Sequence, residues 1–208
     1  MKIIDCEQRS EAWFKARMGI PTCSEFETVM AKGSGKGRRT YMYKLAGERL
    51  NGSPMENYTN AFMERGIRME QEAREAYSIV ASAEVTRVGF ILNEKARCGG
   101  SPDALIGKKG MLEIKTAMPH ILLDILERDE FPAEHVAQCQ GNLWVAERDW
   151  IDIAIYNGDK NPEMPDAPGL PLFVKRAKRD EAYIKKLAAE VAQFNDELDK
   201  IVKKYGGK

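Results

Sequence analysis

Two carboxylates and one lysine stand at a spacing that suits metal-assisted phosphodiester hydrolysis. Pro102-Asp103 is followed after nine residues by Glu113, and Lys115 lies two positions beyond Glu113. Carboxylates that lie close together repel one another, and a divalent cation relieves that repulsion. Hard oxygen ligands suit Mg²⁺ or Mn²⁺, which polarise a phosphoryl oxygen and lower the pKa of a bound water. A lysine beside such a ligand orients or deprotonates that water and offsets charge in the transition state.

A short β-hairpin is expected to bring these side chains together. Leu112 and Ile114 alternate with the glutamate and the lysine, so one face of the strand turns to the core and the other presents both charges. The turn is centred near residues 108–109, which places Asp103 almost opposite Glu113. An ordinary Glu/Lys neighbour pair on an exposed hairpin is the alternative. The Pro-Asp pair on the facing strand favours a site.

A third carboxylate lies on a predicted long helix. Ile67, Ala73 and Tyr77 share one stripe of this helix with Glu70, so the acid interrupts an apolar face. An acid on the buried side of a helix needs a partner, and a metal would serve. An ion pair with Arg74, four residues on, is an equally good explanation.

The pattern of apolar residues predicts the elements that position these groups. Helices are expected over 10–18, 24–30, 40–50, 57–80, 119–128, 132–147 and 180–205, and strands over 85–93, 98–106, 111–116, 150–156 and 172–174. Ser10 and Ser24 are the expected N-caps of the first two helices, the second with Glu27 in a capping box. The basic stretch 32–39 is expected to be a flexible loop, and it lacks the P-loop pattern. We expect a mixed α/β (α+β) fold with one central sheet, in a single domain over 1–208.

The charge of the chain is balanced overall but unevenly placed. Residues 1–50 hold 10 basic and 6 acidic residues, 51–174 hold 12 and 20, and 175–208 hold 10 and 6, giving +4, −8 and +4 and a net charge of zero. Basic ends around an acidic middle suit a protein that holds a polyanion and gathers cations at its centre. Solvated surface charge is the other explanation.

The cysteines exclude two kinds of small stabilised domain. Cys6, Cys23, Cys98 and Cys139 are scattered, without a C-x-x-C pair, which argues against a zinc knuckle and against a disulfide framework. Reduced thiols and the absence of an apolar run near 18 residues favour a cytoplasmic protein.

Four ordered blocks carry a resemblance to a known family. They are 12–24 (AWFKARMGIPTCS), 66–74 (GIRMEQEAR), 101–115 and 137–144 (AQCQGNLW). The Pro-Asp/Glu-x-Lys motif resembles the PD-(D/E)xK nuclease superfamily, and the whole chain resembles more closely the phage lambda-exonuclease (YqaJ-type viral recombinase) family. The resemblance implies a restriction-endonuclease-like core, with a central mixed β-sheet flanked by helices.

The resemblance also implies roles at the metal site. Asp103, Glu113, the Ile114 carbonyl and Glu70 would hold two Mg²⁺ ions, with Mn²⁺ as a substitute. Lys115 would be the catalytic lysine, and Gln138 would lie on a helix close to the active centre.

Three further residues match a site for the 5′-phosphate of DNA in that family. Arg17 would contact the phosphate, with the hydroxyls of Ser24 and Ser101 near it. The residues alone leave other roles open, because Arg17 lies one helical turn after Trp13 and could stack on the indole or pair with an acid. Ser24 could serve only as a cap.

The function implied is a Mg²⁺-dependent 5′→3′ exodeoxyribonuclease. Such an enzyme digests one strand of linear double-stranded DNA from its 5′-phosphorylated end and leaves a 3′ single strand for phage-type recombination. Double-stranded DNA ends, a homotrimeric ring and a single-strand annealing protein are the implied partners, in a bacterial cell with the gene carried by a phage or prophage. An endonuclease or another end-processing nuclease is the alternative within enzymes, although the missing cysteine cluster counts against an iron–sulfur type. A non-hydrolytic DNA-end-binding protein is the alternative outside them.

Overall fold

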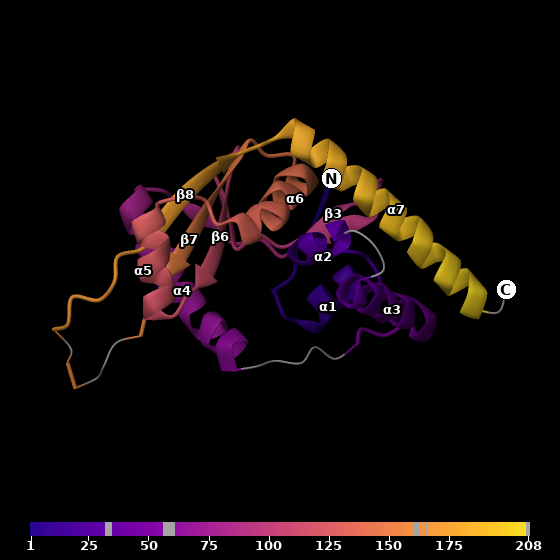
Figure 1. The fold of residues 1–208 in the computed structure, drawn as a ribbon, viewed down its shortest axis with the longest axis horizontal. Helices are drawn as coiled ribbons and strands as arrows, with labels where there is room; N and C mark the ends of the chain where they lie inside the picture. Colours follow the sequence, from indigo (N-terminus) through magenta and orange to yellow (C-terminus); the bar gives the residue numbers. More distant parts are fainter. Residues whose placement is uncertain (32–34, 56–60, 160–162, 165, 207–208) are drawn as a thin grey trace.

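A mixed five-stranded β-sheet forms the centre of the molecule (Figure 1). The structure, a computed structural model, describes residues 1–31, 35–55, 61–159, 163–164 and 166–206, without the side chains of 61–63. The sheet has the strand order β2-β5-β6-β7-β8. Its strands are β2 (Val85–Thr86), β5 (Ala104–Ile106), β6 (Gly110–Thr116), β7 (Trp150–Tyr156) and β8 (Phe173–Lys178). Only β6 and β7 pair in parallel, and the other neighbours are antiparallel.

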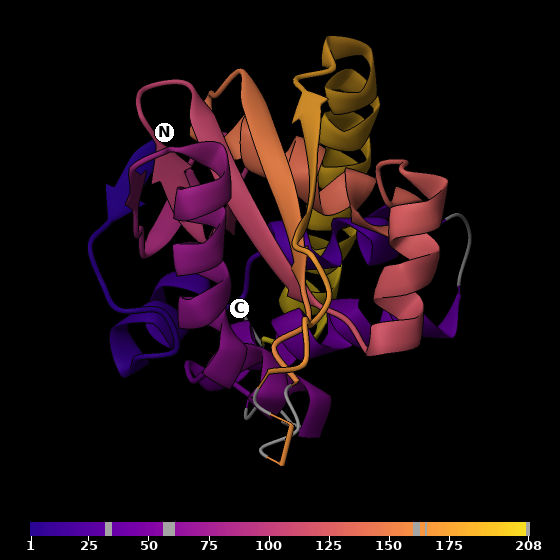
Figure 2. The same ribbon diagram turned by 90° about the vertical axis from the view of Figure 1, so that its left-hand side faces the viewer.

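Helices cover both faces of this sheet, as the end-on view in Figure 2 makes clear. α4 (Ala61–Ala81) packs on the face that carries Leu112 and Ile114. α5 (Pro119–Arg128), the 3₁₀ turn η2 (Ala133–His135) and α6 (Val136–Ala146) cover the opposite face, which carries Glu113. The prediction of a mixed central sheet flanked by helices is therefore confirmed. The expectation that the charged residues of β6 face away from the packed interior is wrong, because both faces are covered.

A second, three-stranded sheet carries the N-terminal part of the chain. Its order is β1-β3-β4, from β1 (Lys2–Ile4), β3 (Phe90–Asn93) and β4 (Cys98–Gly100), all antiparallel. α1 (Glu11–Arg17), the 3₁₀ turn η1 (Cys23–Glu25), α2 (Phe26–Met30) and α3 (Lys36–Asn51) follow β1, and the long α7 (Glu181–Tyr205) packs on α2, α3 and α6. Among the described residues, no helix is long and apolar enough to cross a membrane.

The strand predicted over 98–106 divides between the two sheets. β4 ends at Gly100, and β5 begins at Ala104 in the other sheet. Gly100 fits tightly, since a Cβ there would lie 2.4 Å from Oδ1 of Asn142 and 2.7 Å from Sγ of Cys23. Pro102 follows and has no N–H to extend a ladder. The strand predicted over 85–93 divides for a related reason: Gly89 lies so close to Cys6 that a Cβ would meet its backbone at 2.4 Å.

Two predictions near the N-terminus are corrected. Ser24 is not an N-cap: it lies inside η1, and α2 begins after Glu25 without a side-chain cap. α3 begins at Lys36, one turn earlier than predicted, so the end of the supposed basic loop is helical; 32–34 lie outside the described residues. The cap at Ser10 is confirmed, because its Oγ accepts a hydrogen bond from the Trp13 N–H at 3.3 Å.

A buried charge network fixes α4 to the central sheet. Asp152 of β7 is 3% exposed and accepts two hydrogen bonds from the Arg176 guanidinium of β8, at 2.7 and 2.8 Å. The Tyr77 hydroxyl of α4 donates to the same carboxylate at 2.6 Å, and Arg176 stacks on Trp150 at 3.6 Å. The network ties α4, which carries Glu70, to the sheet that carries the other acids.

Candidate active site

Asp103 and Glu113 meet where β5 and β6 begin to separate. Ala104 pairs with Leu112, which sets Asp103 beside Glu113 in the same register. The Asp103 N–H donates to the Leu112 carbonyl at 3.0 Å, and its carboxylate accepts from the Ile114 N–H at 2.6 Å. The backbone of β6 therefore orients the first carboxylate, as the predicted hairpin required.

Glu113 is held by amide and ammonium donors on both of its oxygens. Oε1 accepts from Nζ of Lys115 at 2.9 Å and from Nε2 of Gln138 at 2.6 Å, and Oε2 accepts from Nδ2 of Asn142 at 3.1 Å. The carboxylate is 3% exposed, so these bonds replace the water that it loses on burial. Gln138, which the family resemblance singled out, therefore lies in contact with Glu113.

Asn142 is a site residue that the sequence analysis missed. It lies four positions after Gln138 on α6, so both amides project from one side of that helix. The Gln-x-x-x-Asn spacing is the signal that could have identified it. Its Oδ1 is buried and has no hydrogen-bond partner among the described residues. The two amides together fix the orientation of Glu113.

The site raises the proton affinity of one acid and keeps the lysine charged. Burial, and then repulsion from Glu113, raise the pKa of Asp103 to about 8, while Lys115 opposes the rise. Burial alone would lower the pKa of Lys115, but the negative charges of Glu113 and Asp103 outweigh it and raise that pKa above its usual value. The ammonium is therefore available to stabilise negative charge on a bound phosphate.

The Glu70 carboxylate forms ion pairs with two arginines. Its Oε1 accepts from Arg74 of the same helix at 2.6 Å, and its Oε2 accepts from Arg9 at 2.8 Å. Among the described residues, no three Asp, Glu, His or Cys side chains form a group that could hold a metal ion, so Glu70 does not join the pair at metal-binding distance here. The ion pair considered as an alternative for Glu70 is thus present. Arg9, which has a positive φ of 70°, was not foreseen.

The remaining acid pair has the chemistry of a hard-cation site. Asp103 and Glu113 are close enough for mutual repulsion to raise the pKa of Asp103, and a divalent cation would remove that cost. Their oxygens are the donor type that Mg²⁺ and Mn²⁺ prefer. The chemistry of Asp103 and Glu113 therefore fits the predicted cation.

Arg17 lies in a separate hollow between α1 and α3. Its guanidinium stacks on the Trp13 ring at 4.1 Å and donates to the Thr22 hydroxyl at 3.2 Å. Burial lowers the pKa of Arg17, and the nearby Tyr41 and Glu48 offset only part of that effect. No acid forms an ion pair with this arginine in the part of the chain that the structure describes. A partly buried cation that has no ion-pair partner among the described residues suits an anion-binding site.

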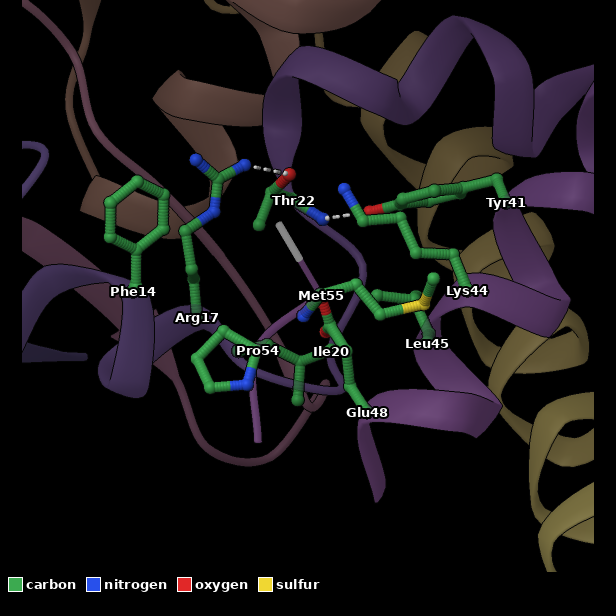
Figure 3. A pocket seen from close by; sticks show the side chains of 10 residues that line it. All are labelled: Phe14, Arg17, Ile20, Thr22, Tyr41, Lys44, Leu45, Glu48, Pro54 and Met55. Atoms are coloured by element: carbon green, nitrogen blue, oxygen red, sulfur yellow. Dashed lines mark hydrogen bonds between the residues drawn. The ribbon is translucent and has the colours of Figure 1, made fainter. Parts of the chain in front are cut away.

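Other polar groups gather around the same hollow (Figure 3). Lys44 of α3 and Arg17 approach Thr22 from opposite sides, and the Tyr41 hydroxyl accepts from the Thr22 N–H at 3.1 Å. Oγ of Ser24 lies 3.3 Å from the hydroxyl of Thr22, which lines the hollow, although Ser24 itself caps no helix. Thr22, Tyr41 and Lys44 were not singled out from the sequence.

Trp13 links the hollow to the acid pair. The indole N–H donates to Oγ of Ser101 at 2.7 Å, and Ser101 lies two residues before Asp103. Gln8 reinforces the link, because its amide donates to the Pro102 carbonyl at 3.1 Å. The predicted phosphate-binding residues thus lie along one connected path that leads to the predicted metal ligands.

Comparison with known proteins identifies the family of the chain. Residues 12–149 match the model of the YqaJ-like viral recombinase domain, which is more than half of the sequence. The chain belongs to this family, as the ordered motifs predicted. No curated protein is found to be similar to it in sequence.

Solved structures of two proteins share the fold over nearly the whole chain. The alkaline exonuclease LHK-Exo from Laribacter hongkongensis is 32% identical, with a TM-score of 0.82 over 93% of this chain and 95% of that chain. The same protein in complex with dAMP gives the same values. A phage-related exonuclease from Haemophilus somnus 129PT is 14% identical, with a TM-score of 0.68 over 89% of this chain and 96% of that one, and is similar in fold.

Proposed function

We propose that this protein is a deoxyribonuclease that digests linear double-stranded DNA from its 5′ end. The observation that carries the proposal is the convergence of Asp103, Glu113 and Lys115 beside β6, with Gln138 fixing Glu113. Similarity to an alkaline exonuclease, one of whose structures holds dAMP, supports a DNA substrate. The 5′→3′ polarity and the use of the product as a 3′ single strand for recombination are part of the proposal.

The residues of the acid pair would hold Mg²⁺, or Mn²⁺ in its place. Asp103 and Glu113 are the ligands proposed first, with the Ile114 carbonyl and a released Glu70 completing a two-ion site. Bound Mg²⁺ supplies Lewis acidity toward the scissile phosphate and lowers the pKa of water. Gln138 and Asn142 keep both oxygens of Glu113 in place while substrate exchanges.

Lys115 acts as a cation in this mechanism. The attack of water on phosphorus, followed by loss of the 3′ oxygen, accumulates negative charge on the phosphoryl oxygens. The raised pKa of Lys115 keeps its ammonium protonated near neutral pH, so it orients the phosphate and offsets that charge. This favours charge stabilisation over proton abstraction, the two roles that the sequence left open for the lysine.

Arg17, Ser24 and Ser101 would bind the terminal 5′-phosphate. The partly buried guanidinium of Arg17 supports this role, since no described acid forms an ion pair with it and a phosphate would supply such a partner. Ser101 joins this end to Asp103 through the Trp13 indole. A 5′-phosphate bound there places the first phosphodiester bond toward the acid pair.

A homotrimeric ring, a single-strand annealing partner and a cytoplasmic, phage-associated setting complete the proposal. A chain of zero net charge is a poor clamp for duplex DNA as a monomer, whereas several copies could line a channel with their basic termini. Sedimentation tests this directly, and a single species of 23.5 kDa would rule out the ring.

The decisive experiment compares linear and circular duplex DNA with Mg²⁺, with Ca²⁺ and with EDTA, beside Lys115→Ala. Loss of the linear substrate alone, dependent on Mg²⁺ and on Lys115, supports the exonuclease. Nicking of circles would favour an endonuclease, and binding without degradation would favour an end-binding protein. Labelling each strand end separately gives the polarity.

A further inference from the structure

A second hollow adjoins the proposed catalytic lysine on the side away from Arg17. This α5 pocket has a volume of about 210 Å³ and is lined by Arg65, Lys115, Met118, Ile121, Ile125 and His135, among others. It lies where β6 ends and α5 begins, whereas the hollow around Arg17 lies between α1 and α3 (Figure 1). The two hollows share no lining residue, so the α5 pocket is separate from the hollow around Arg17.

The surface of the α5 pocket is apolar in a place where water could reach it. Ile121 is 45% exposed and Met118 is 36% exposed, although each borders the hollow. Ile125, 7% exposed, forms a packed wall behind them. Large aliphatic side chains held open to water beside a catalytic residue favour a ligand with a flat apolar face.

The polar groups of the pocket suit a nucleotide. The Arg65 guanidinium is held by the Asp159 carboxylate at 2.7 Å and by the Ala117 carbonyl at 3.2 Å, so its position is fixed. Burial, and then the charge of Lys115, lower the pKa of His135 to about 4, so the imidazole is neutral near pH 7. A neutral imidazole offers one donor and one acceptor to the edge of a base. The exposed Glu134 at the rim makes a free anion a poor occupant.

The direction of the DNA strand determines which nucleotide can reach the α5 pocket. With the 5′-phosphate at Arg17 and the first phosphodiester bond over Asp103 and Glu113, the first nucleotide spans those two points. The chain beyond the scissile bond then passes Lys115, which lines the α5 pocket.

We propose that the α5 pocket binds the base of the second nucleotide of the digested strand, counted from its 5′ end. The base would lie against Ile121 and Met118, with its edge toward His135. This inference rests on the proposed function, because it takes the strand direction from the 5′-phosphate site. It adds a contact on the part of the strand that remains after cleavage, which would hold the new end in place between cycles.

The test combines a modified substrate with two matched variants. Duplex oligonucleotides carry an abasic residue at nucleotide 2 or, as a reference, at nucleotide 10 of the 5′-phosphorylated strand. With the abasic residue at nucleotide 2, one apolar stacking contact is lost, and we expect the first nucleotide to be released about tenfold more slowly. Ile121→Ser should release the first nucleotide of intact DNA about tenfold more slowly, and the abasic residue should not change its rate further. Leu123→Ser is the control, since Leu123 is 48% exposed on the same helix but does not line the pocket.

An equilibrium measurement separates failure of this inference from failure of the proposed function. Fluorescence anisotropy in Ca²⁺ with the same oligonucleotides should show the same tenfold discrimination in affinity, without any hydrolysis. If the abasic residue lowers the DNA affinity of Ile121→Ser as much as that of the unmodified protein, the pocket does not bind the base.

A change of sedimentation coefficient in Ile121→Ser, with its DNA discrimination intact, would assign this face to a second copy and overturn the inference. A protein that digests DNA without any discrimination at nucleotide 2 would overturn the pocket alone. A protein that neither digests nor binds linear DNA would overturn both proposals.

Discussion

Arg9 and Glu70 form an ion pair of 2.8 Å at the edge of the acid pair. The side chain of Arg9 is 42% exposed and that of Glu70 is 11% exposed, so the arginine is the partner that water and ligands can reach. Arg74, which holds the other oxygen of Glu70, is 7% exposed. Of these two arginines, Arg9 is therefore the one that can leave Glu70 at lower cost.

Removing Arg9 is expected to strengthen divalent cation binding. Arg9→Ala frees one oxygen of Glu70 and removes a positive charge near the site, so titration calorimetry with Mn²⁺ should show about two- to fivefold higher affinity. Arg97→Ala is the matched control, because Arg97 is 44% exposed and pairs with Asp199. Equal changes in both variants would show that only the net charge matters.

Loss of either amide on Glu113 should weaken the metal site. Gln138→Ala and Asn142→Ala each remove one hydrogen bond that orients the carboxylate. We expect about tenfold or greater loss of metal affinity and of activity for each. Gln193→Ala, which removes a hydrogen bond to Glu197 on α7, should change neither. A metal affinity equal to that of the unmodified protein in both active-site variants would remove the amides from the mechanism.

The pKa of Asp103 predicts how stability depends on pH without metal. Its pKa is about 8 in the folded protein and about 3.9 in an unfolded chain, so between these values only the folded state holds the proton. Proton uptake then favours folding, and the free energy of unfolding should fall as pH rises from about 4 to about 8. Urea titrations in EDTA measure this slope, and Asp103→Asn should reduce it. An unchanged slope in the variant would assign it to other groups.

The same titration predicts a Mg²⁺ affinity that increases toward alkaline pH. A metal ligand must be deprotonated, so Mg²⁺ affinity should rise through the pKa of Asp103 and level off above about 8. Affinity measured at pH 6.5, 7.5 and 8.5 checks this. A flat profile would mean that the cation binds without competition from a proton on Asp103.

Arg17 should determine the preference for phosphorylated ends. Arg17→Ala removes the guanidinium that is proposed to bind the 5′-phosphate and that donates to the Thr22 hydroxyl. We therefore expect the ratio of rates on 5′-phosphate and 5′-hydroxyl ends to fall about tenfold. Arg17→Lys should recover part of the ratio, since it restores charge without the planar fork. Single-turnover digestion of the two substrates provides the measurement, and a ratio equal to that of the unmodified protein would place the phosphate elsewhere.

The sequence allowed prediction of the parts of the site that depend on short-range geometry. The turn between β5 and β6 sets Asp103 beside Glu113, and one helical turn sets Arg74 beside Glu70, so spacing alone was informative. Arg9 reaches Glu70 across 61 residues, and no local pattern specifies that pair. Asn142 reaches Glu113 across 29 residues, and its spacing from Gln138 on the same helix was the one local signal for it. The second sheet was missed because its strands are short and because the close approach at Gly100 depends on the packing of α6.

The C-terminal part of the chain contributes no side chain to the proposed site, but the site depends on it because Arg176 pairs with the buried Asp152. The family match ends at residue 149, and a fragment cut at residue 159 would keep every proposed catalytic and phosphate-binding side chain. It would nevertheless leave a carboxylate sealed in the interior without the Arg176 guanidinium that neutralises it. Such a fragment should fail to accumulate as a folded species, so any minimal nuclease engineered from this chain has to retain β8.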